Sequence, residues 1–411
     1  MNITIIGTGY VGLTVGACLA SLKHKVYCVD NNSSKINALK NNTLPLYEPG
    51  LKELISSNIC FTTNIEEALT KSDICFITVG TPQAGDNSAD LSYIKEVILQ
   101  ISKYINTYKL IVIKSTVPPG TNRELSKLLR KHTSVPFDII SNPEFLRQGS
   151  AVSDFMHPDR VVIGADNKEA VIPLYNIYSV LTNKIIVTDS VSAELIKYAS
   201  NSFLATKISF INEISNICQA VGGDIKTVEE GLGLDHRIGS AFLSSGIGYG
   251  GSCFPKDIRA LIHVAESNKY SAELLKAVDN VNSAQVEVFL RKIRKKFSSD
   301  LSGLTFAVWG LTFKPNTDDL RESPAAAIVN KLISAGANVI AYDPKVSDYT
   351  NIRVVQDMYS VFENANALLV LTDWEVFKAP DFSKVNVPAI FDGRHIYNKK
   401  ELIERGFEYY G

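Results

Sequence analysis

Long apolar runs and clustered metal ligands are both missing from this 411-residue sequence. No apolar run approaches the ~18 residues of a membrane-spanning helix, which predicts a soluble protein without a membrane partner. The six histidines form no HxH or HExxH pair and the six cysteines no CxxC pair, so we expect no metal site and no disulfide scaffold.

An excess of charge and an export signal are also missing. The formal net charge is −1, so the chain has no global basic field and we expect no nucleic-acid partner. The basic run RKIRKKF at 291–297 is interpreted as a solvated helix face. The N-terminal MNITIIGTGYVG enters a strand pattern at once, without a basic segment and an apolar stretch of the secretory type, which predicts a cytoplasmic protein.

A glycine-rich turn joins a short apolar strand to an apolar helix at the start of the chain. We predict a strand at 2–6, a helix at 13–22 and a second strand at 25–29 that ends at Asp30. In this βαβ pattern the first glycine makes the turn, the second admits a pyrophosphate and the third packs helix on strand. Asp30 would bind the adenosine ribose and repel a 2′-phosphate, which favours NAD over NADP, although Lys35 could soften that preference. The residues predicted to bind the cofactor here are Gly7, Gly9, Tyr10, Val11, Gly12, Asp30 and Lys35.

Polar side chains follow three further apolar strands. Thr81 follows a predicted strand at 74–79, Thr116 follows one at 110–115, and Glu144 follows the apolar pair Ile139–Ile140. The carboxyl ends of strands line the crevice in which open α/β sheets bind ligands, so the threonines are candidate cofactor or water contacts. A carboxylate there can orient water or accept a proton. The alternative is that the Thr-x-Pro segments only cap their strands.

The middle of the chain contains a long amphipathic pattern at 192–217, with apolar residues at 195, 199, 204, 208 and 211. Asn201 and Lys207 interrupt it. They are six residues apart and do not lie on one straight stripe of a 3.6-residue helix. From these residues alone, Lys207 is interpreted as a surface lysine.

Cys253 stands apart from the other five cysteines, which have apolar neighbours and are predicted to be core residues. It lies in GIGYGGSCFPKD at 246–257, where the glycines would let the backbone close around a bulky ligand. Pro255 suits the first turn of a helix predicted at 257–266. The positive end of that helix and Lys256 would favour the nucleophilic thiolate. The alternative is a buried structural thiol.

A second βα alternation fills the last third, with predicted strands at 304–310, 337–342, 367–371 and 389–391. It lacks a GxGxxG turn and instead carries FKP at 313–315 and DDLRESP at 318–324, where basic groups beside a helix start suit a diphosphate. The predicted fold class is therefore α/β, with two Rossmann-like doubly wound domains joined by a central long-helix segment.

The motifs GTGYVG, STVPPG, NPEFLRQG, NSFLATK and GYGGSCFPKD occur in the order found in the UDP-glucose 6-dehydrogenase family, which the whole chain resembles. The resemblance implies an NAD-binding domain at 1–190, a central helical dimerisation and catalytic segment at 191–298, and a UDP-sugar-binding domain at 299–411. It implies a homodimer through the central helices, with UDP-glucose as the small-molecule substrate. The reaction implied is four-electron oxidation to UDP-glucuronate, reducing two NAD through a thiohemiacetal and a thioester on Cys253.

The resemblance also assigns catalytic roles. Lys207 and Asn201 would stabilise oxyanions at C6, which reverses the surface interpretation of the lysine. Asp257 would hold a water, and Thr116 and Glu144 would position the water that hydrolyses the thioester. The first proton acceptor stays open between Lys207 and a water on Asp257. Gln148 stands where family members often carry a second acid.

The binding residues that the resemblance implies form three groups. Arg237 would reach the substrate of a neighbouring subunit. The cofactor would be contacted by Thr81, Thr116, Glu144, Lys256 and Arg321. The sugar nucleotide would be contacted by Glu144, Phe145, Leu146, Arg147, Lys197, Asn201, Lys207, Tyr249, Gly250, Phe313, Lys314 and Arg394.

Three other functions remain open at this point. A related enzyme could oxidise UDP-N-acetylmannosamine, UDP-N-acetylglucosamine or GDP-mannose by the same chemistry. A two-electron dehydrogenase of the hydroxyacid type would need no thiol, and a nucleotide-sugar sensor would keep the folds for binding alone. The yield of NADH per sugar separates the last two from a four-electron enzyme.

Overall fold

The structure, a computed structural model, describes residues 1–411 and consists of two compact units. The first unit contains Met1–Ser200 with His263–Tyr270, and the second contains Asn201–Ile262 with Ser271–Gly411. Helix α9 (Ser190–Val221) begins in the first unit and continues into the second. No helix combines the length and the apolarity that crossing a membrane requires.

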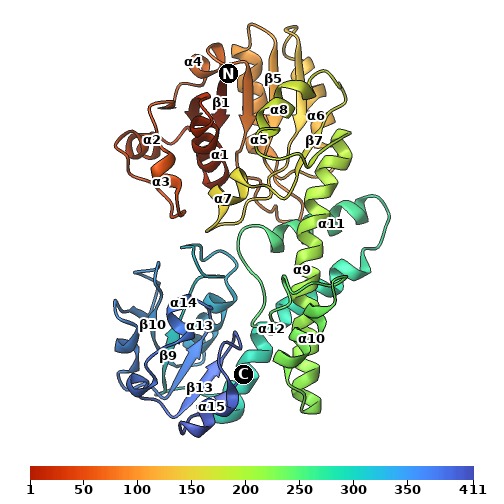
Figure 1. The fold of residues 1–411 in the computed structure, drawn as a ribbon. Helices are drawn as coiled ribbons and strands as arrows, with labels where there is room; N and C mark the ends of the chain where they lie inside the picture. Colours follow the sequence, from red (N-terminus) through yellow and green to blue (C-terminus); the bar gives the residue numbers. More distant parts are fainter. The chain divides into compact units, whose positions relative to one another are not determined.

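The first unit is built on an eight-stranded sheet with the order β3-β2-β1-β4-β5-β6-β7-β8 (Figure 1). Its neighbouring strands are parallel, except for β6 and β7, which pair antiparallel. The order reverses between β1 and β4, and α/β sheets bind ligands at the carboxyl ends of strands beside such a reversal. The strands are β1 Asn2–Ile6, β2 Lys25–Val29, β3 Ile59–Thr62, β4 Ile74–Ile77, β5 Lys109–Ile113, β6 Phe137–Ser141, β7 Val161–Gly164 and β8 Ile185–Thr188.

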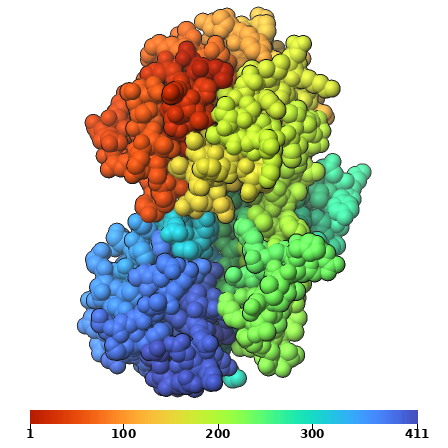
Figure 2. Space-filling view, in the orientation of Figure 1, coloured from red at the N-terminus to blue at the C-terminus, as the bar shows by residue number.

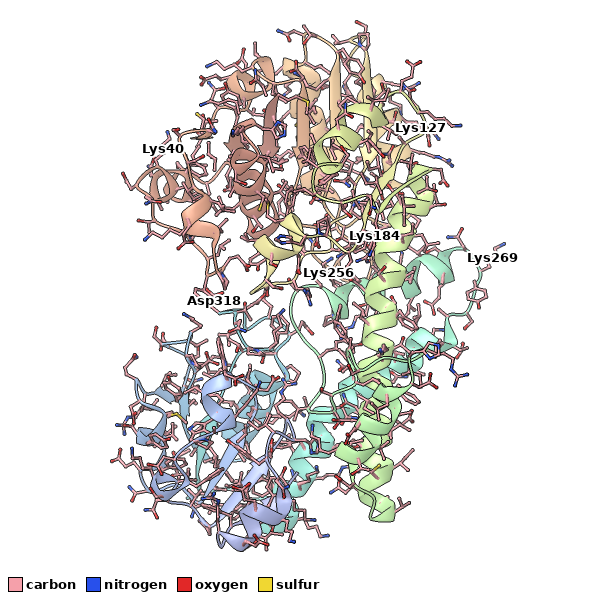
Figure 3. The ribbon with its side chains drawn as sticks, viewed as in Figure 1. Lys40, Lys127, Lys184, Lys256, Lys269 and Asp318 are labelled. Atoms are coloured by element: carbon pink, nitrogen blue, oxygen red, sulfur yellow. The ribbon has the colours of Figure 1, made fainter.

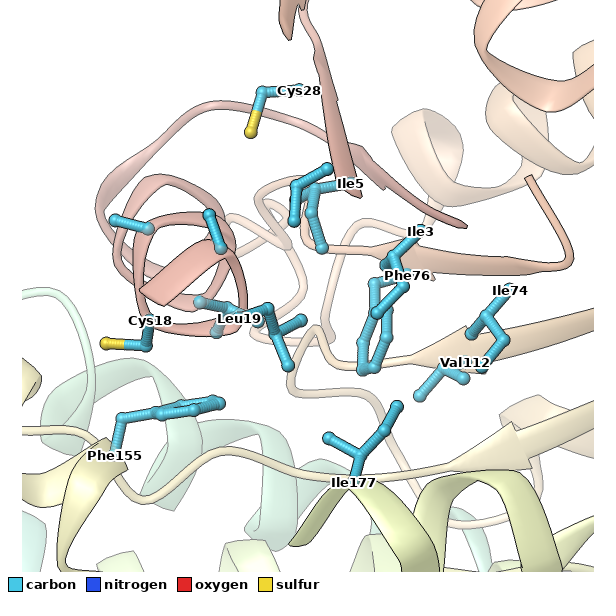
Figure 4. Close-up of a cluster of buried hydrophobic side chains, with 14 of the residues drawn as sticks. Ile3, Ile5, Cys18, Leu19, Cys28, Ile74, Phe76, Val112, Phe155 and Ile177 are labelled. Carbon is cyan, nitrogen blue, oxygen red and sulfur yellow. The ribbon is translucent and has the colours of Figure 1, made fainter. Parts of the chain in front are cut away.

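Helices cover both faces of this sheet because successive strand residues point to opposite sides. Ile3 and Ile5 of β1 belong to one core cluster with residues of α1, α7 and α8, as Figure 4 shows for Leu19, Phe155 and Ile177. Ile6 belongs to a second cluster with residues of α5 and α6. The helices are α1 Tyr10–Ser21, α2 Ser33–Lys40, α3 Leu51–Leu54, α4 Ile65–Thr70, α5 Ser92–Tyr104, α6 Thr121–Arg130, α7 Ala151–Met156 and α8 Val171–Tyr178.

The second unit joins central helices to a parallel six-stranded sheet with the order β11-β10-β9-β12-β13-β14. Counted from β9, this is again 3-2-1-4-5-6, the order of a doubly wound dinucleotide-binding fold. In Figure 2 the blue surface of this sheet domain lies against the green surface of the central helices. The elements are α10 Ile225–Leu234, α11 Phe254–Ser267, α12 Glu273–Phe297, β9 Thr305–Trp309, α13 Pro324–Ser334, β10 Asn338–Tyr342, β11 Arg353–Val354, β12 Ala367–Val370, α14 Glu375–Lys378, β13 Ala389–Asp392, α15 Lys399–Glu404 and β14 Glu408–Tyr410, with 3-10 turns at Met358–Phe362 and Phe382–Lys384.

The start of the second sheet repeats the geometry of the first without its ligand-binding features. Gly310 follows β9 with φ 91°, as Gly7 follows β1 with φ 99°. Asp343 follows β10 as Asp30 follows β2, but it is buried and accepts hydrogen bonds from the backbone N–H of Leu311 and the indole of Trp374. An acid satisfied in this way inside the core is not available to a ribose.

The predicted α/β fold is confirmed, and β1 and β2 have the predicted bounds. The sequence pattern gave no prediction for β3, β7, β8, β11, β14 or most of α12. The prediction that the apolar positions of α9 form its buried face was partly wrong. Leu195 and Ala199 are exposed, whereas the polar Lys197 and Asn201 are buried. The predicted domain boundaries stay predictions.

Candidate active site

The glycine turn between β1 and α1 is closely packed at its ends and open at its centre. A Cβ on Gly12 would lie 1.9 Å from the Gly7 carbonyl oxygen and 2.4 Å from the Thr78 hydroxyl. A Cβ on Gly9 would have no atom within 4 Å. The open position stands at the N-terminus of a 12-residue helix, where backbone N–H groups and the helix dipole favour a phosphate. The turn therefore fits the pyrophosphate of a dinucleotide.

Asp30 occupies the ribose position at the end of β2. Its Oδ2 accepts hydrogen bonds from the backbone N–H of Thr8 at 2.9 Å, from the Thr8 hydroxyl at 2.8 Å and from the Lys35 ammonium at 2.7 Å. Burial alone would raise the pKa of Asp30, but the hydrogen bonds from Lys35, Asn32 and Thr8 outweigh it and hold the pKa below its usual value. The carboxylate is thus ionised at neutral pH and can accept from ribose hydroxyls.

Replacing Gly12 or Gly9 by alanine should have different effects on stability and on cofactor binding. Gly12→Ala forces a methyl group into backbone and should destabilise the first unit by roughly 2–4 kcal/mol, as overpacking does when nothing can move. Gly9→Ala should leave the melting temperature unchanged and weaken NADH binding by about tenfold, because the methyl group occupies the space a phosphate needs. Thermal denaturation and NADH fluorescence titration check both, and equal melting temperatures for the two variants would contradict this assignment.

The carboxyl ends of β4 and β5 are tied to each other and to α9. The Thr81 hydroxyl donates to the Thr116 carbonyl oxygen at 2.8 Å. Glu194 of α9 accepts from the backbone N–H groups of Gly120 at 2.6 Å and Asn122 at 2.8 Å, and burial raises its pKa to about 7. A small pocket here is lined by Ile113, Ser115, Thr116, Val117, Ser141, Pro143, Glu194 and Lys197. Sequence reasoning found Thr116 but missed Glu194.

Lys197 and Glu144 form a buried ion pair beside this pocket. The ammonium lies 3.0 Å from Glu144 Oε1, and the residues are 4% and 6% exposed. The Phe145 ring lies 5.4 Å from the same ammonium and 3.5 Å from the Arg160 guanidinium. Two charges held this far from water interact strongly with any third charge that forms nearby.

A second buried lysine, Lys114, lies behind that pair. It donates to Asn142 Oδ1 at 3.0 Å and to the Tyr178 hydroxyl at 3.2 Å. Burial lowers the pKa of Lys114 to about 7; the charge of Glu144 opposes this shift and that of Lys197 adds to it. The positive charge of Lys114 therefore varies with pH near neutrality.

Lys207 lies in a different setting from Lys197. Its ammonium donates to the backbone carbonyls of Ile238 at 3.1 Å and Gly239 at 3.4 Å. Lys197 and Asn201 are four residues apart on α9 and so lie on one face of that helix, which Lys207 does not share. The catalytic role predicted for Lys207 is untested, and this geometry favours Lys197 for it.

Cys253 is the one cysteine of the six that is exposed; Cys60 is half-buried and the other four are buried. It is the N-cap residue of the 14-residue helix α11, since its carbonyl accepts from the backbone N–H of Asp257 at 3.0 Å. An exposed sulfur at the N-terminus of a helix suits a thiolate. By contrast, burial raises the pKa of Cys18, Cys28 and Cys75 to about 12.

Lys256 and Asp257 in the first turn of α11 form a hydrogen-bonded group with Asn201 of α9. Asp257 is 1% exposed, and its two oxygens accept from Lys256 Nζ and from Asn201 Nδ2, each at 2.6 Å. Figure 3 labels Lys256 at the start of this helix. Asp257 thereby fixes both an ammonium and an amide close to the turn that carries Cys253.

The glycines before Cys253 pack closely against protein atoms, and the expectation that their backbone closes around a ligand stays a prediction. A Cβ on Gly250 would lie 2.0 Å from the Glu322 carbonyl oxygen, and one on Gly251 would lie 2.7 Å from the Phe313 ring. The Gly251 N–H donates to the Arg321 carbonyl at 2.9 Å. The cysteine loop and the 313–322 loop are therefore neighbours, a contact that the sequence did not reveal. The ring of Tyr249 is buried in an apolar cluster.

The arginines predicted to bind the sugar nucleotide each have a protein partner. Arg394 donates to the carbonyls of Leu371 at 2.8 Å and Phe313 at 3.2 Å, which places it beside the residues predicted to contact the nucleotide. Arg237 forms an ion pair with Asp235 at 2.6 Å and is otherwise exposed. Arg147 forms one with Asp154 at 2.6 Å.

A dinucleotide turn with its ribose acid, a second nucleotide-type fold and an exposed helix-capping cysteine together define a dehydrogenase with a nucleotide-bearing substrate. Models of the UDP-glucose/GDP-mannose dehydrogenase family match the chain in three parts: the NAD binding domain at residues 1–182, the central domain at 191–284 and the UDP binding domain at 307–399. The chain belongs to this family and is an NAD-dependent oxidoreductase.

Individual relatives match this chain over nearly all of their length. The UDP-glucose 6-dehydrogenase of Rickettsia bellii is 44% identical, covering 100% of this chain and 99% of the relative, and TuaD of Bacillus subtilis is 43% identical, covering 100% and 92%. The solved UDP-glucose dehydrogenase of Pyrobaculum islandicum has a TM-score of 0.94 at 36% identity, covering 100% of this chain and 96% of that one. The UDP-D-ManNAc dehydrogenase of Pyrococcus horikoshii has a TM-score of 0.89 at 27% identity, covering 100% and 99%.

Proposed function

We propose that this chain oxidises the C6 hydroxyl of UDP-glucose to a carboxylate, releasing UDP-glucuronate. The observation that carries the proposal is the exposed Cys253 at the N-terminus of α11, next to the Asn201–Asp257–Lys256 group. The UDP binding domain match supports a UDP-sugar substrate, and the relatives named UDP-glucose 6-dehydrogenase support glucose as the sugar.

NAD, bound at the glycine turn, would accept the hydride at each of the two oxidations. In the first, C6 loses a hydride and its hydroxyl loses a proton, either to a lysine or to a water held by Asp257, which gives an aldehyde. The sulfur of Cys253 then forms a bond to the aldehyde carbon, and the carbonyl oxygen becomes the oxyanion of a thiohemiacetal. A positive ammonium and the Asn201 amide stabilise that oxyanion.

The covalent step makes the second oxidation possible, because an aldehyde donates hydride poorly until a nucleophile makes its carbon tetrahedral. Loss of the second hydride from C6 leaves a thioester on Cys253. A water oriented by Glu144 and Thr116 attacks the acyl carbon, the carbon–sulfur bond breaks and the thiolate is regenerated. Gln148 has no carboxylate, so Glu144 supplies the carboxylate of this loop that can accept a proton from the water.

Lys197 is our candidate for the ammonium, in place of the Lys207 predicted from the sequence. It is buried, it is paired with Glu144, and it lies one helical turn from Asn201. A charge in such surroundings stabilises a nearby oxyanion more than an ammonium bound to exposed backbone carbonyls does.

A panel of nucleotide sugars tests the substrate. The purified protein with NAD should form NADH fastest with UDP-glucose, by at least ~10²-fold over UDP-N-acetylmannosamine, UDP-N-acetylglucosamine and GDP-mannose, because buried polar groups left unpaired penalise a wrong substrate heavily. A higher rate with one of those three would identify a sister enzyme. No turnover with any of them would favour a binding protein.

The chain also carries a surface suited to a homodimer. Phe203, Phe210 and Ile217 are seven residues apart on α9 and are 65%, 47% and 51% exposed. A heptad-spaced apolar stripe on a long helix packs well against the same stripe of a second copy related by a two-fold axis. The exposed Arg237, whose loop is held by Lys207, could then reach the neighbouring subunit.

Charges placed in this stripe should separate the subunits. Phe203→Glu together with Phe210→Glu should shift the mass measured by light scattering from about 90 kDa to the 45.1 kDa of one chain, because two carboxylates cannot be buried unpaired. Ile172→Glu on α8, where the native side chain is 58% exposed, serves as the matched control and should leave the dimer intact. A double variant that stays dimeric would place the interface elsewhere.

A further inference from the structure

We propose that Glu48 is a positioning residue that couples dinucleotide binding to sugar-nucleotide binding, because its carboxylate joins the glycine turn to the loop that follows β6. Glu48 lies in the irregular segment 41–50 between α2 and α3 and is 5% exposed. It belongs to neither of the two segments that it connects. The inference rests on the proposed function, in which residues 144–147 contact the sugar nucleotide.

The contacts of Glu48 converge from two directions. The Tyr10 hydroxyl donates to Oε2, and the backbone N–H of Gly149 donates to the same oxygen at 2.7 Å. That N–H also lies 2.9 Å from the Tyr10 hydroxyl, so the three groups form a closed hydrogen-bonded ring. The backbone N–H of Ala151 donates to Oε1 at 2.7 Å.

Each end of this connection leads directly to a predicted binding element. Tyr10 is the fourth residue of the glycine turn and the first residue of α1, whose N-terminus suits the pyrophosphate. Gly149 lies near the end of the loop 142–150, which also contains Glu144, and the backbone and guanidinium of Arg147 in that loop donate to Asp154 of α7. A displacement of either element therefore changes the hydrogen bonds of the other.

A purely structural role explains less of the geometry. The N–H groups of Gly149 and Ala151 need acceptors where they are buried, and Glu48 provides them. These N–H groups stand at the start of α7, where a carboxylate is a favourable acceptor. Capping alone, however, gives no reason for the phenol of Tyr10 to donate to the same oxygen. A carboxylate that is hydrogen-bonded to both the glycine turn and the loop that follows β6 is explained if these two segments must move together.

Coupling of this kind is reciprocal, so each ligand should tighten the binding of the other. NADH with UDP-glucose allows a measurement without turnover, because the reduced cofactor cannot accept a hydride. In the wild type, we expect saturating UDP-glucose to lower the dissociation constant of NADH by at least about fivefold in a fluorescence titration.

Glu48→Gln should reduce this effect to less than about twofold, while its affinity for NADH alone changes by less than about threefold, and Tyr10→Phe should reduce the effect to less than about twofold as well. Both variants should raise KM for UDP-glucose more than they lower kcat. Tyr10→Phe removes a single hydroxyl group and decides the matter if Glu48→Gln does not fold. The control is Asp357→Asn, which alters a carboxylate that accepts from two backbone N–H groups, those of Tyr359 and Ser360, in the second unit. It should leave the coupling at the wild-type value.

Coupling that persists at the wild-type value in Tyr10→Phe and in folded Glu48→Gln would overturn the proposal, and so would a wild type that binds both ligands without coupling. Failure of the proposed function looks different, since the wild type would then neither bind nor oxidise UDP-glucose. In that case the same titration with the nucleotide sugar that the wild type does oxidise decides on Glu48.

Discussion

Cys253→Ser should stop the formation of UDP-glucuronate, lowering kcat for the acid by at least ~10³-fold, as loss of a covalent nucleophile does in other enzymes. A serine hydroxyl is not ionised at neutral pH and adds slowly to an aldehyde, so the thiohemiacetal that precedes the second oxidation does not form. Chromatographic quantification of UDP-glucuronate against time measures the effect.

The matched control is Cys60→Ser, which changes a half-buried cysteine in the strand β3. This variant should keep kcat within about twofold of the wild type, since surface and half-buried substitutions away from a site usually have small effects. Production of the acid by Cys253→Ser at the wild-type rate would remove the nucleophilic role of Cys253.

Lys197→Met should lower kcat by ~10²- to 10³-fold, the loss typical when one preorganised donor to an oxyanion is removed. Lys207→Met should stay within about threefold of the wild type, because the Lys207 ammonium binds backbone carbonyls instead. The two lysines lie on the same helix, so each variant is the control of the other. Steady-state kinetics at saturating UDP-glucose and NAD measure both.

Removing Lys197 also leaves Glu144 buried without its partner, which should cost roughly 3–5 kcal/mol of stability. The double variant Lys197→Met with Glu144→Gln removes both charges and should recover much of this stability while remaining inactive. A loss of activity confined to Lys207→Met would return the catalytic role to the lysine that the sequence indicated.

The first βαβ unit could be predicted from sequence because its determinants are local. The glycine spacing, the apolar strands and the acid at residue 30 all lie within thirty residues, and the structure places β1, β2 and the turn as predicted. The position of Cys253 at a helix start was also local information, carried by the Pro255 that follows it.

The polar face of α9 could not be predicted because it inverts the usual pattern. Amphipathic helices normally bury their apolar side. In α9 the buried positions include Glu194, Lys197 and Asn201, while Phe203 and Phe210 are exposed. The proposed active site on one side of α9 and the proposed dimer surface on the other would both alter that pattern, so the sequence pattern did not reveal that Lys197 is buried.

Glu48 and Glu194 were beyond sequence reasoning for another reason. Their partners are far away along the chain: Gly149 and Ala151 for Glu48, and Gly120 and Asn122 for Glu194. A buried carboxylate looks like a surface carboxylate until tertiary contacts are known. The solvated face expected for the basic run at 291–297 is present only in part. Lys296 pairs with Glu408 and Arg294 with Glu287, but Lys292 is half-buried and donates to the Gly411 carbonyl at 2.8 Å.

The yield of NADH per molecule of UDP-glucose tests the central claim most directly. A limiting, weighed amount of UDP-glucose is incubated with excess NAD until absorbance at the reduced-nicotinamide band stops rising, and the products are separated. Two NADH per sugar with UDP-glucuronate as the sole product agree with oxidation through a thioester on Cys253. One NADH per sugar with an accumulated aldehyde would contradict it.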